Sequence, residues 1–280
     1  MLTSNVFRQH WAALRALLVL TVILGIAYPV GIWLVAQLPG LSHRADGSIV
    51  EAGGKPVGSA LIGQSFTDAD GAALPQYFQS RPSNAGDGYD PLATGASNLG
   101  PESMVDAPDT PSLLTLVCSR SKEVGEREGV DGLRPYCTGG GVGAVLSVSA
   151  SRVVSVNEPC DQVATPFVST YAGMRVECAR PGEDYSTGRL VPVRGDAPAD
   201  SAVPADAVTA SGSGLDPDIS PAYADVQIGR IAQARGVSPG AVKAIVDDHT
   251  TGRTLGFLGE PRVNVLEVNL ALDQRYPERQ

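Results

Sequence analysis

The chain has 280 residues, of which 30 are acidic and 21 basic, and its formal net charge is −9 at pH 7. An acidic chain without clusters of lysine and arginine lacks the electrostatic footprint of a nucleic-acid binder, so we expect no nucleic-acid partner. Its 3 histidines lie apart from its 4 cysteines, which excludes the usual zinc-site spacings. We therefore expect no metal site.

Residues 16–38 form an unbroken apolar run without a charged side chain. As a helix this run would reach ~35 Å, enough to cross the ~30 Å hydrocarbon core of a bilayer. It is too long for the apolar core of a signal peptide, and Gln37-Leu38-Pro39 makes a poor cleavage site. The run therefore predicts a retained transmembrane helix. Gly25, Pro29 and Gly31 lie within it and predict a contact face for a neighbouring helix.

The residues that flank this run predict its orientation. Residues 1–15 contain Arg8 and Arg15 and no acid, whereas both signs of charge follow the run. The positive-inside rule then predicts a cytoplasmic tail over 1–15 and an extracytoplasmic part over 39–280, in a single-pass protein of the cell membrane. All the cysteines lie in that outer part, and their even number predicts two disulfides with three possible pairings. They are Cys118, Cys137, Cys160 and Cys178.

The outer part is predicted to be an α+β domain. Its first part, 39–110, contains expected strands at 48–50 and 57–66 and a loop rich in Pro, Gly, Ser and Asn at 81–101. Residues 111–200 are interpreted as a disulfide-supported β-rich insertion. Its expected strands are 113–118, 142–148, 152–156 and 175–178. The glycine run at 138–143 lacks the Lys-Ser/Thr of a phosphate-binding loop and is interpreted as a turn.

Residues 201–280 carry the signals of helices. Ser220-Pro221 and Ser238-Pro239 each place an N-cap before a proline at the first helical position, and Gly236 is expected to end the first helix. Asn264, with Glu267 three residues later, resembles a capping box. The apolar faces expected to be buried contain Val242, Ile245, Val246 and His249 in one helix and Leu266, Leu270 and Leu272 in the next.

The residues suited to nucleophilic catalysis do not form a recognisable set. Ser211 or Ser213 could be paired with His249 and with the acids at 247–248, but no G-x-S-x-G elbow is present. The acids at 216 and 218 are interpreted as turn residues. We expect no catalytic residues, and hence a protein that acts by contacting partners.

Two blocks of sequence resemble a known family. The first contains GSALIGQSF (58–66), YFQSRPS (77–83) and YDPLATGASNLGP (89–101). The second contains VPADAVTASGSGLDPDISP (203–221) and HTTGRTLGFLGEPRVNVLEVNLALD (249–273). These strings, behind one membrane helix, resemble the C subunit of the Kdp potassium-transporting P-type ATPase, over residues 10–105 and 203–273. The family joins its two blocks through a short helical stretch, which we expect to be replaced here by residues 106–202.

The resemblance implies an accessory, non-catalytic subunit of an ATP-driven potassium uptake complex. Its implied partners are a channel-like potassium-binding subunit, a P-type ATPase catalytic subunit, a small membrane subunit and the lipid bilayer. It implies a role in assembly, and a role as a catalytic chaperone that raises the ATP affinity of the complex, with ATP as the one possible cofactor. An extracytoplasmic domain cannot meet cytoplasmic ATP, so we expect stabilisation through the helix and outer loops rather than direct nucleotide binding.

The motif residues are the candidates for binding. Direct nucleotide or partner contact would fall on Gln79, Ser80 and Arg81 and on the loop Ser211, Gly212, Ser213 and Gly214. Docking outside the membrane is expected at Arg81, Ser83, Asn98, Gly100 and the segment Gly256–Arg262. Two alternatives remain: a membrane-anchored extracytoplasmic binding or envelope module that works through the insertion, and an anchored hydrolase that uses Ser213 and His249.

Overall fold

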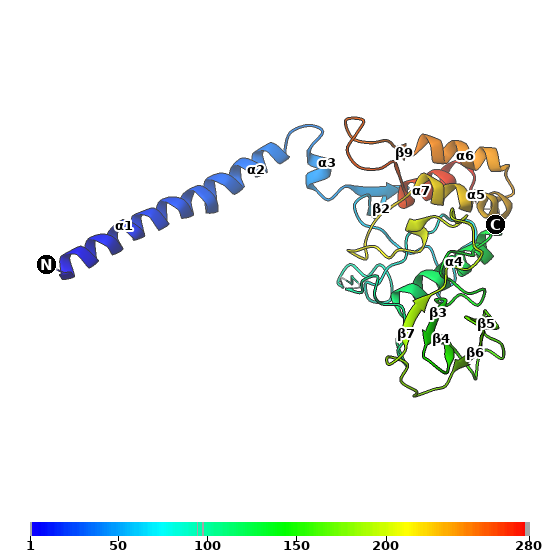
Figure 1. Ribbon diagram of the computed structural model, residues 1–280. Helices are drawn as coiled ribbons and strands as arrows, with labels where there is room; N and C mark the ends of the chain where they lie inside the picture. Colours follow the sequence, from blue (N-terminus) through cyan, green and yellow to red (C-terminus); the bar gives the residue numbers. More distant parts are fainter. Residues whose placement is uncertain (1, 94, 97, 278–280) are drawn as a thin grey trace. The chain divides into compact units, whose positions relative to one another are not determined.

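The computed structural model describes residues 2–93, 95–96 and 98–277, and the chain divides into two compact units at Leu61 (Figure 1). The first unit contains helical and hairpin elements in this order: α1 (Leu2–Val22), the π-helical turn η1 (Ile23–Ala27), α2 (Tyr28–Ala36), the short α3 (Ser42–Ala45), and the antiparallel strands β1 (Ile49–Ala52) and β2 (Lys55–Ser59). The strand expected over 57–66 therefore ends at Ser59, whose hydroxyl bonds to Gly47 and Leu61 and closes the hairpin.

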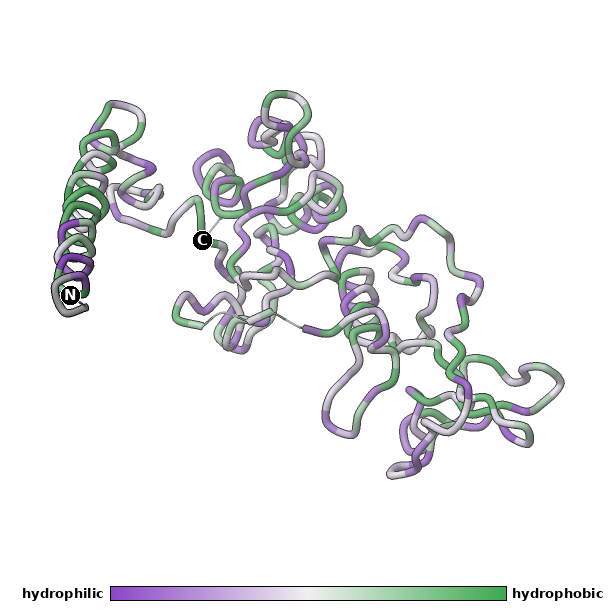
Figure 2. The backbone as a smooth tube through the Cα atoms, turned by 60° about the vertical axis from the view of Figure 1, so that its left-hand side comes forward, coloured by the Kyte–Doolittle hydropathy of each residue, from purple (hydrophilic) through white to green (hydrophobic). Residues whose placement is uncertain are grey.

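The apolar run forms one continuous helix with α1, which begins at Leu2 and so includes the predicted tail. Figure 2 shows that hydrophilic and hydrophobic residues alternate near the N-terminus and that a continuous hydrophobic stretch follows them. Within the described residues, 5–36 is the one helix long and apolar enough to cross a membrane. The π turn precedes Pro29, which has no N–H to give to the carbonyl of Gly25. The wider turn accommodates the proline without breaking the helix.

The second unit begins at Ile62, and its C-terminal part is helical as predicted. Its elements are η2 (Ala205–Ala207), β8 (Asp218–Ile219), α5 (Pro221–Arg235), α6 (Pro239–Asp248), β9 (Thr250–Thr251), β10 (Arg262–Asn264) and α7 (Val265–Arg275). Ser220, Ser238 and Asn264 each accept a bond from a backbone N–H three residues later, which confirms the three N-caps. The left-handed Gly236 ends α5. A three-stranded antiparallel sheet, in the order β8-β10-β9, lies beside these helices.

The expected strand at 113–118 is wrong, because these residues begin the helix α4 (Leu113–Glu128). Ser112 caps it by accepting from the N–H of Thr115, and the left-handed Gly129 ends it. Its buried positions follow helical spacing but are small or polar: they are Thr115, Cys118, Ser121, Val124 and Gly125. The run Leu113–Cys118 contains Thr115 and Val117, whose branched side chains are typical of strands, so the helical spacing of the buried positions was not recognised.

A five-stranded sheet follows α4, in the order β5-β6-β4-β3-β7. Its strands are β3 (Val145–Val148), β4 (Val153–Pro159), β5 (Thr170–Tyr171), β6 (Met174–Ala179) and β7 (Arg189–Pro192). The expected strands at 142–148, 152–156 and 175–178 are therefore confirmed, with shifted ends. One disulfide joins Cys118 of α4 to Cys137, and the other joins Cys160 to Cys178 of β6.

The larger hydrophobic core lies among the helices of the second unit. Phe78, Tyr223, Ile231, Ile245 and Leu272 are all at most 1% exposed there. A second cluster beneath the five-stranded sheet is built around Leu146, Val153 and Val176. In Figure 1, α4 lies between the helices α5–α7 and that sheet. Leu270, expected to be buried, is only half-buried, whereas Asn269 is buried.

Candidate functional site

The YFQS segment (77–80) belongs to no helix or strand, and its backbone pairs with side chains instead of a neighbouring strand. The N–H of Phe78 donates to Oδ1 of Asn269 at 2.8 Å, and Nδ2 of Asn269 donates to the carbonyl of Phe78 at 3.0 Å. Gln227 does the same for Gln79, with bonds of 2.7 and 3.1 Å. The two amides, from α7 and α5, thus satisfy buried backbone groups that have no sheet partner.

A buried ion cluster holds the chain at the start of this segment. Glu128 at the end of α4 has a fully buried carboxylate, paired with Arg127 at 2.8 Å and with Arg230 at 2.9 Å. Arg230 also donates to the carbonyls of Pro75 and Tyr77 at 2.6 and 3.0 Å. The carboxylate and both guanidinium groups are paired, and pairing is the condition for burying such charges. The carboxylate of Glu128 thus joins the end of α4 to α5, and Arg230 of α5 in turn holds the loop at Pro75.

The two motif blocks meet directly at Arg81. Its Nη1 lies 2.6 Å from Oδ2 of Asp216, and its Nη2 donates to the carbonyl of Thr209. Ser83 donates to the carbonyl of Gly214 at 2.6 Å, and the N–H of Ser211 donates to the carbonyl of Pro82 at 2.9 Å. We call this set of contacts between residues 81–89 and 209–216 the clasp.

Tyr89 completes the clasp and shows how closely it is packed. Its hydroxyl donates to the carbonyl of Arg81 at 2.7 Å, and burial, with smaller contributions from neighbours that include Asp216, raises its pKa to about 12. Gly63 packs so tightly that an added Cβ would lie 2.5 Å from both the carbonyl of Asp216 and the Tyr89 ring. Any larger residue at 63 would force this junction open.

The candidate nucleotide residues are therefore brought together, but Gln79, Arg81 and Ser211 each use side-chain polar groups in bonds within the chain. Gln79 and Ser211 are buried, at 8% and 2% exposure. A hollow of about 180 Å³ remains beside Arg81, whose Nε has no partner in the described part of the chain. Ser65, Thr67, Gln79, Ser80, Ser83, Gly88 and Tyr89 also line it. Gly212 and Ser213 are exposed to solvent.

The residues considered for hydrolysis each have local partners. Ser213 bonds to the hydroxyl of Ser211 and accepts from the N–H of Leu215. His249 pairs through Nδ1 with the carbonyl of Ile245 in its own helix. No hydrogen bond joins Ser213 to His249 among the described residues, and no group of three metal-ligating side chains occurs among them. These local contacts hold Ser213 and His249 separately and do not bring the considered nucleophile and base together.

The remaining docking candidates make none of the clasp contacts themselves. Asn98 is exposed, and Gly100 packs against the carboxylate of Glu102. Gly256 and Arg262 belong to the hairpin that joins β9 to β10, where Arg262 pairs with Asp218 at 3.1 Å. Gly25 and Gly31 lie on the membrane helix, and an added Cβ at either would meet nothing closer than 3.9 Å. The chain itself leaves this helix surface open.

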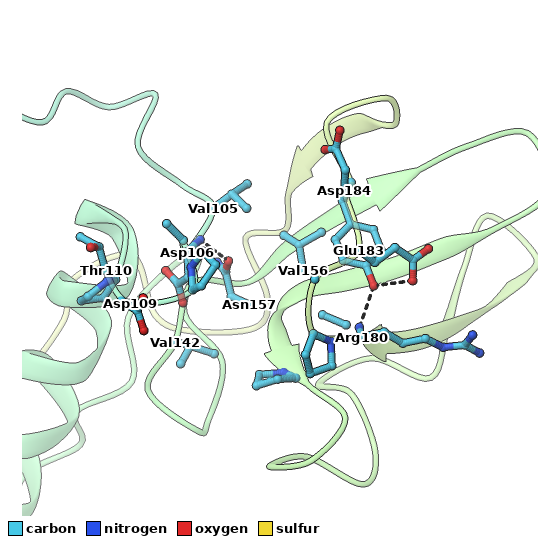
Figure 3. Close-up of a pocket in the computed structure, with 18 of the residues that line it drawn as sticks. Val105, Asp106, Asp109, Thr110, Val142, Val156, Asn157, Arg180, Glu183 and Asp184 are labelled. Atoms are coloured by element: carbon cyan, nitrogen blue, oxygen red, sulfur yellow. Dashed lines mark hydrogen bonds between the residues drawn. The ribbon is translucent and has the colours of Figure 1, made fainter.

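A cleft of about 960 Å³ lies beside the five-stranded sheet (Figure 3). Val105, Asp106 and Asp109 line one side, and Arg180, Glu183 and Asp184 line the other. Asp106 is fixed by its N–H bond to Asn157 at 2.9 Å, and the exposed carboxylates face solvent. The residues that line the cleft include side chains of both signs of charge.

The sequence prediction missed Gln227, Arg230, Asn269 and Glu128, which hold the motif in place. A signal was present, because Asn269 falls on the face of α7 that also carries Leu266 and Leu272. A buried amide on such a face requires a partner. The partner lies 191 residues away in sequence, so the pattern could not identify it.

These observations define a class: an α+β protein with one membrane-capable N-terminal helix and a tightly bonded motif junction. The sequence profile described as "K+-transporting ATPase, c chain" (KdpC) matches residues 10–127 and 188–274. Relatives named potassium-transporting ATPase KdpC subunit are found in Kineococcus radiotolerans, with 39% identity over 98% of this chain and 97% of the relative, and in Streptomyces avermitilis, with 37% over 97% and 96%. The relative in Mycobacterium tuberculosis is 36% identical over 95% of this chain and 98% of its own.

The chain belongs to the KdpC family, and as a subunit of the potassium-transporting ATPase it has an accessory role in potassium uptake. The family profile also corrects one expectation. Of residues 106–202, which we expected to replace family sequence, the profile matches 106–127, and thus nearly all of α4, as well as 188–202, so only residues 128–187 of this stretch lie outside it. The match to the Kineococcus relative covers 98% of this chain and 97% of the relative, so residues 128–187 are aligned as well.

Proposed function

We propose that this chain is the single-pass accessory subunit that assembles and stabilises the potassium-transporting complex, with residues 1–15 in the cytoplasm and 39–280 outside. The match to the KdpC family, which includes the membrane-capable helix and both motif blocks, carries this proposal. The orientation is supported by Arg8 and Arg15 before the apolar run and by two disulfides after it.

The partners we propose are a channel-like potassium-binding subunit, a P-type ATPase subunit and a small membrane subunit. We propose that an increase in ATP affinity is transmitted through contacts with these subunits, without nucleotide bound at Gln79–Arg81 or Ser211–Gly214. Support comes from the clasp, in which Arg81 and Ser211 already bond to the chain itself, and from Gln79, whose side-chain amide donates to the carbonyl of Phe66. An outer position for these loops would also separate them from cytoplasmic ATP.

The experiment is co-purification of the full chain, tagged at its C-terminus and extracted in mild detergent, with an assay of potassium-stimulated ATP hydrolysis. We expect a multi-subunit complex with a P-type ATPase that loses activity when this chain is deleted. A chain that purifies alone, with transport intact in its absence, would contradict the proposal. Labelling of this chain by a photoreactive ATP analogue in the isolated state would contradict the indirect route to ATP.

The membrane helix provides a sharper variant. Gly25→Leu with Gly31→Leu adds bulk where the chain itself leaves open space, so the helix and outer domain remain folded while a neighbouring helix is pushed away. We expect the yield of assembled complex to fall several-fold. Ala16→Leu in the same helix is the matched control and should assemble normally. Unchanged assembly of the double variant would exclude this face as a contact.

A further inference from the structure

The hairpin between β9 and β10 exposes an apolar tip, which we define as Leu255, Phe257 and Leu258. These side chains are 79%, 67% and 50% exposed, and every residue from 251 to 260 is exposed. None of the three belongs to either hydrophobic core. Large apolar side chains gathered at one projecting point mark a contact site more often than isolated ones do.

The tip is held in a fixed shape. Thr254 and Leu258 exchange backbone hydrogen bonds of 2.8 and 2.9 Å, and Arg253 pairs with Glu260 across the base of the loop. Leu255 has φ of 54°, a left-handed conformation that costs a non-glycine residue free energy. The hairpin thus keeps a strained leucine in solvent, although the core gains nothing from it.

The charges around the tip favour a protein partner over a lipid surface. The chain carries a net charge of −9, and an acidic domain is repelled from anionic headgroups. The base of the tip carries one ion pair and hence no net charge, and residues 254–259 contain no lysine, tryptophan or tyrosine of the kind that anchors interfacial segments. The tip thus presents an uncharged apolar surface that backbone hydrogen bonds hold in shape.

We propose that the apolar tip inserts into a hydrophobic pocket on the outer face of another subunit of the same potassium-transporting complex. The proposal rests on the proposed function, which places the second unit outside the membrane beside those subunits. It adds the contacting side chains and the chemistry of the partner surface. The ion pair between Arg253 and Glu260 then lies at the rim, where water still reaches it.

Cysteine protection tests this directly, because the chain has no free cysteine in its described part. Phe257→Cys is labelled with a membrane-impermeant maleimide in the assembled complex and in the isolated full chain. Ser151→Cys, at the exposed turn between β3 and β4, is the matched control. We expect labelling of residue 257 to slow at least about tenfold in the complex, and labelling of residue 151 to remain unchanged. Equal rates at 257 in both states would overturn the proposal.

Two further measurements separate the possible occupants. A photoreactive benzoylphenylalanine at 257 should cross-link to another subunit of the complex; cross-links confined to lipid or to a second copy of this chain would overturn the proposal. The triple variant Leu255→Ser, Phe257→Ser and Leu258→Ser should lower the yield of complex on the order of tenfold, the size expected for a lost central contact. If the wild-type chain recovers no partner subunit, the proposed function itself has failed. If it recovers partners and the tip stays reactive, only the tip proposal has failed.

Discussion

Replacement of Asn269 by alanine tests whether side-chain amides hold the YFQS segment. The Asn269 amide accepts from the N–H of Phe78 and donates to its carbonyl, and both residues are at most 1% exposed. Asn269→Ala leaves two backbone groups buried without partners, at ~1–3 kcal/mol each, or ~2–6 kcal/mol together. The better helix propensity of alanine returns about 0.5 kcal/mol. We expect a net loss of about 2–5 kcal/mol in the free energy of unfolding.

Urea unfolding of the full chain in detergent, followed by near-ultraviolet circular dichroism, measures this loss. With a slope of about 2 kcal/mol per molar urea, the midpoint should fall by ~1–2.5 M. Gln274→Ala is the matched control, since it removes an exposed amide from the same helix and should stay within ~0.5 kcal/mol. A midpoint shift no larger than that of the control, with the Phe78 amide still protected from hydrogen exchange, would refute the reasoning.

Two other predictions concern pH and covalent links. Because Tyr89 has a pKa of about 12 in the folded chain and 10.0 as its ordinary value, the unfolded state releases its proton first, and stability falls as pH rises between these values. The Tyr89→Phe variant should lose stability less steeply across that window, and parallel pH profiles would contradict this. Peptide mapping without reductant should find Cys118 linked to Cys137 and Cys160 to Cys178. Replacing the first pair by alanine should cost about 3 kcal/mol for a loop of this length, as measured by urea unfolding with the second pair intact, and an unchanged midpoint would contradict it.

Local signals in the sequence determined the elements whose causes are local. The apolar run predicts the membrane-capable helix because its composition and length suffice for that property. Ser220, Ser238 and Asn264 predict helix starts because an N-cap acts within three residues of itself. The beginning of α4 was missed for a related reason: its buried face carries Thr115 and Ser121, so composition concealed the helical period.

The motif blocks could be recognised from the sequence, but their physical role could not. Arg81 and Asp216 are separated by 135 residues, and Phe78 and Asn269 by 191. No periodicity links residues so far apart, and only the packed fold shows that the motifs bond chiefly to one another. Likewise, the sequence contains Leu255 and Phe257 as ordinary apolar residues. Their exposure follows from the hairpin, whose stem pairs with the sheet while its tip extends beyond the core.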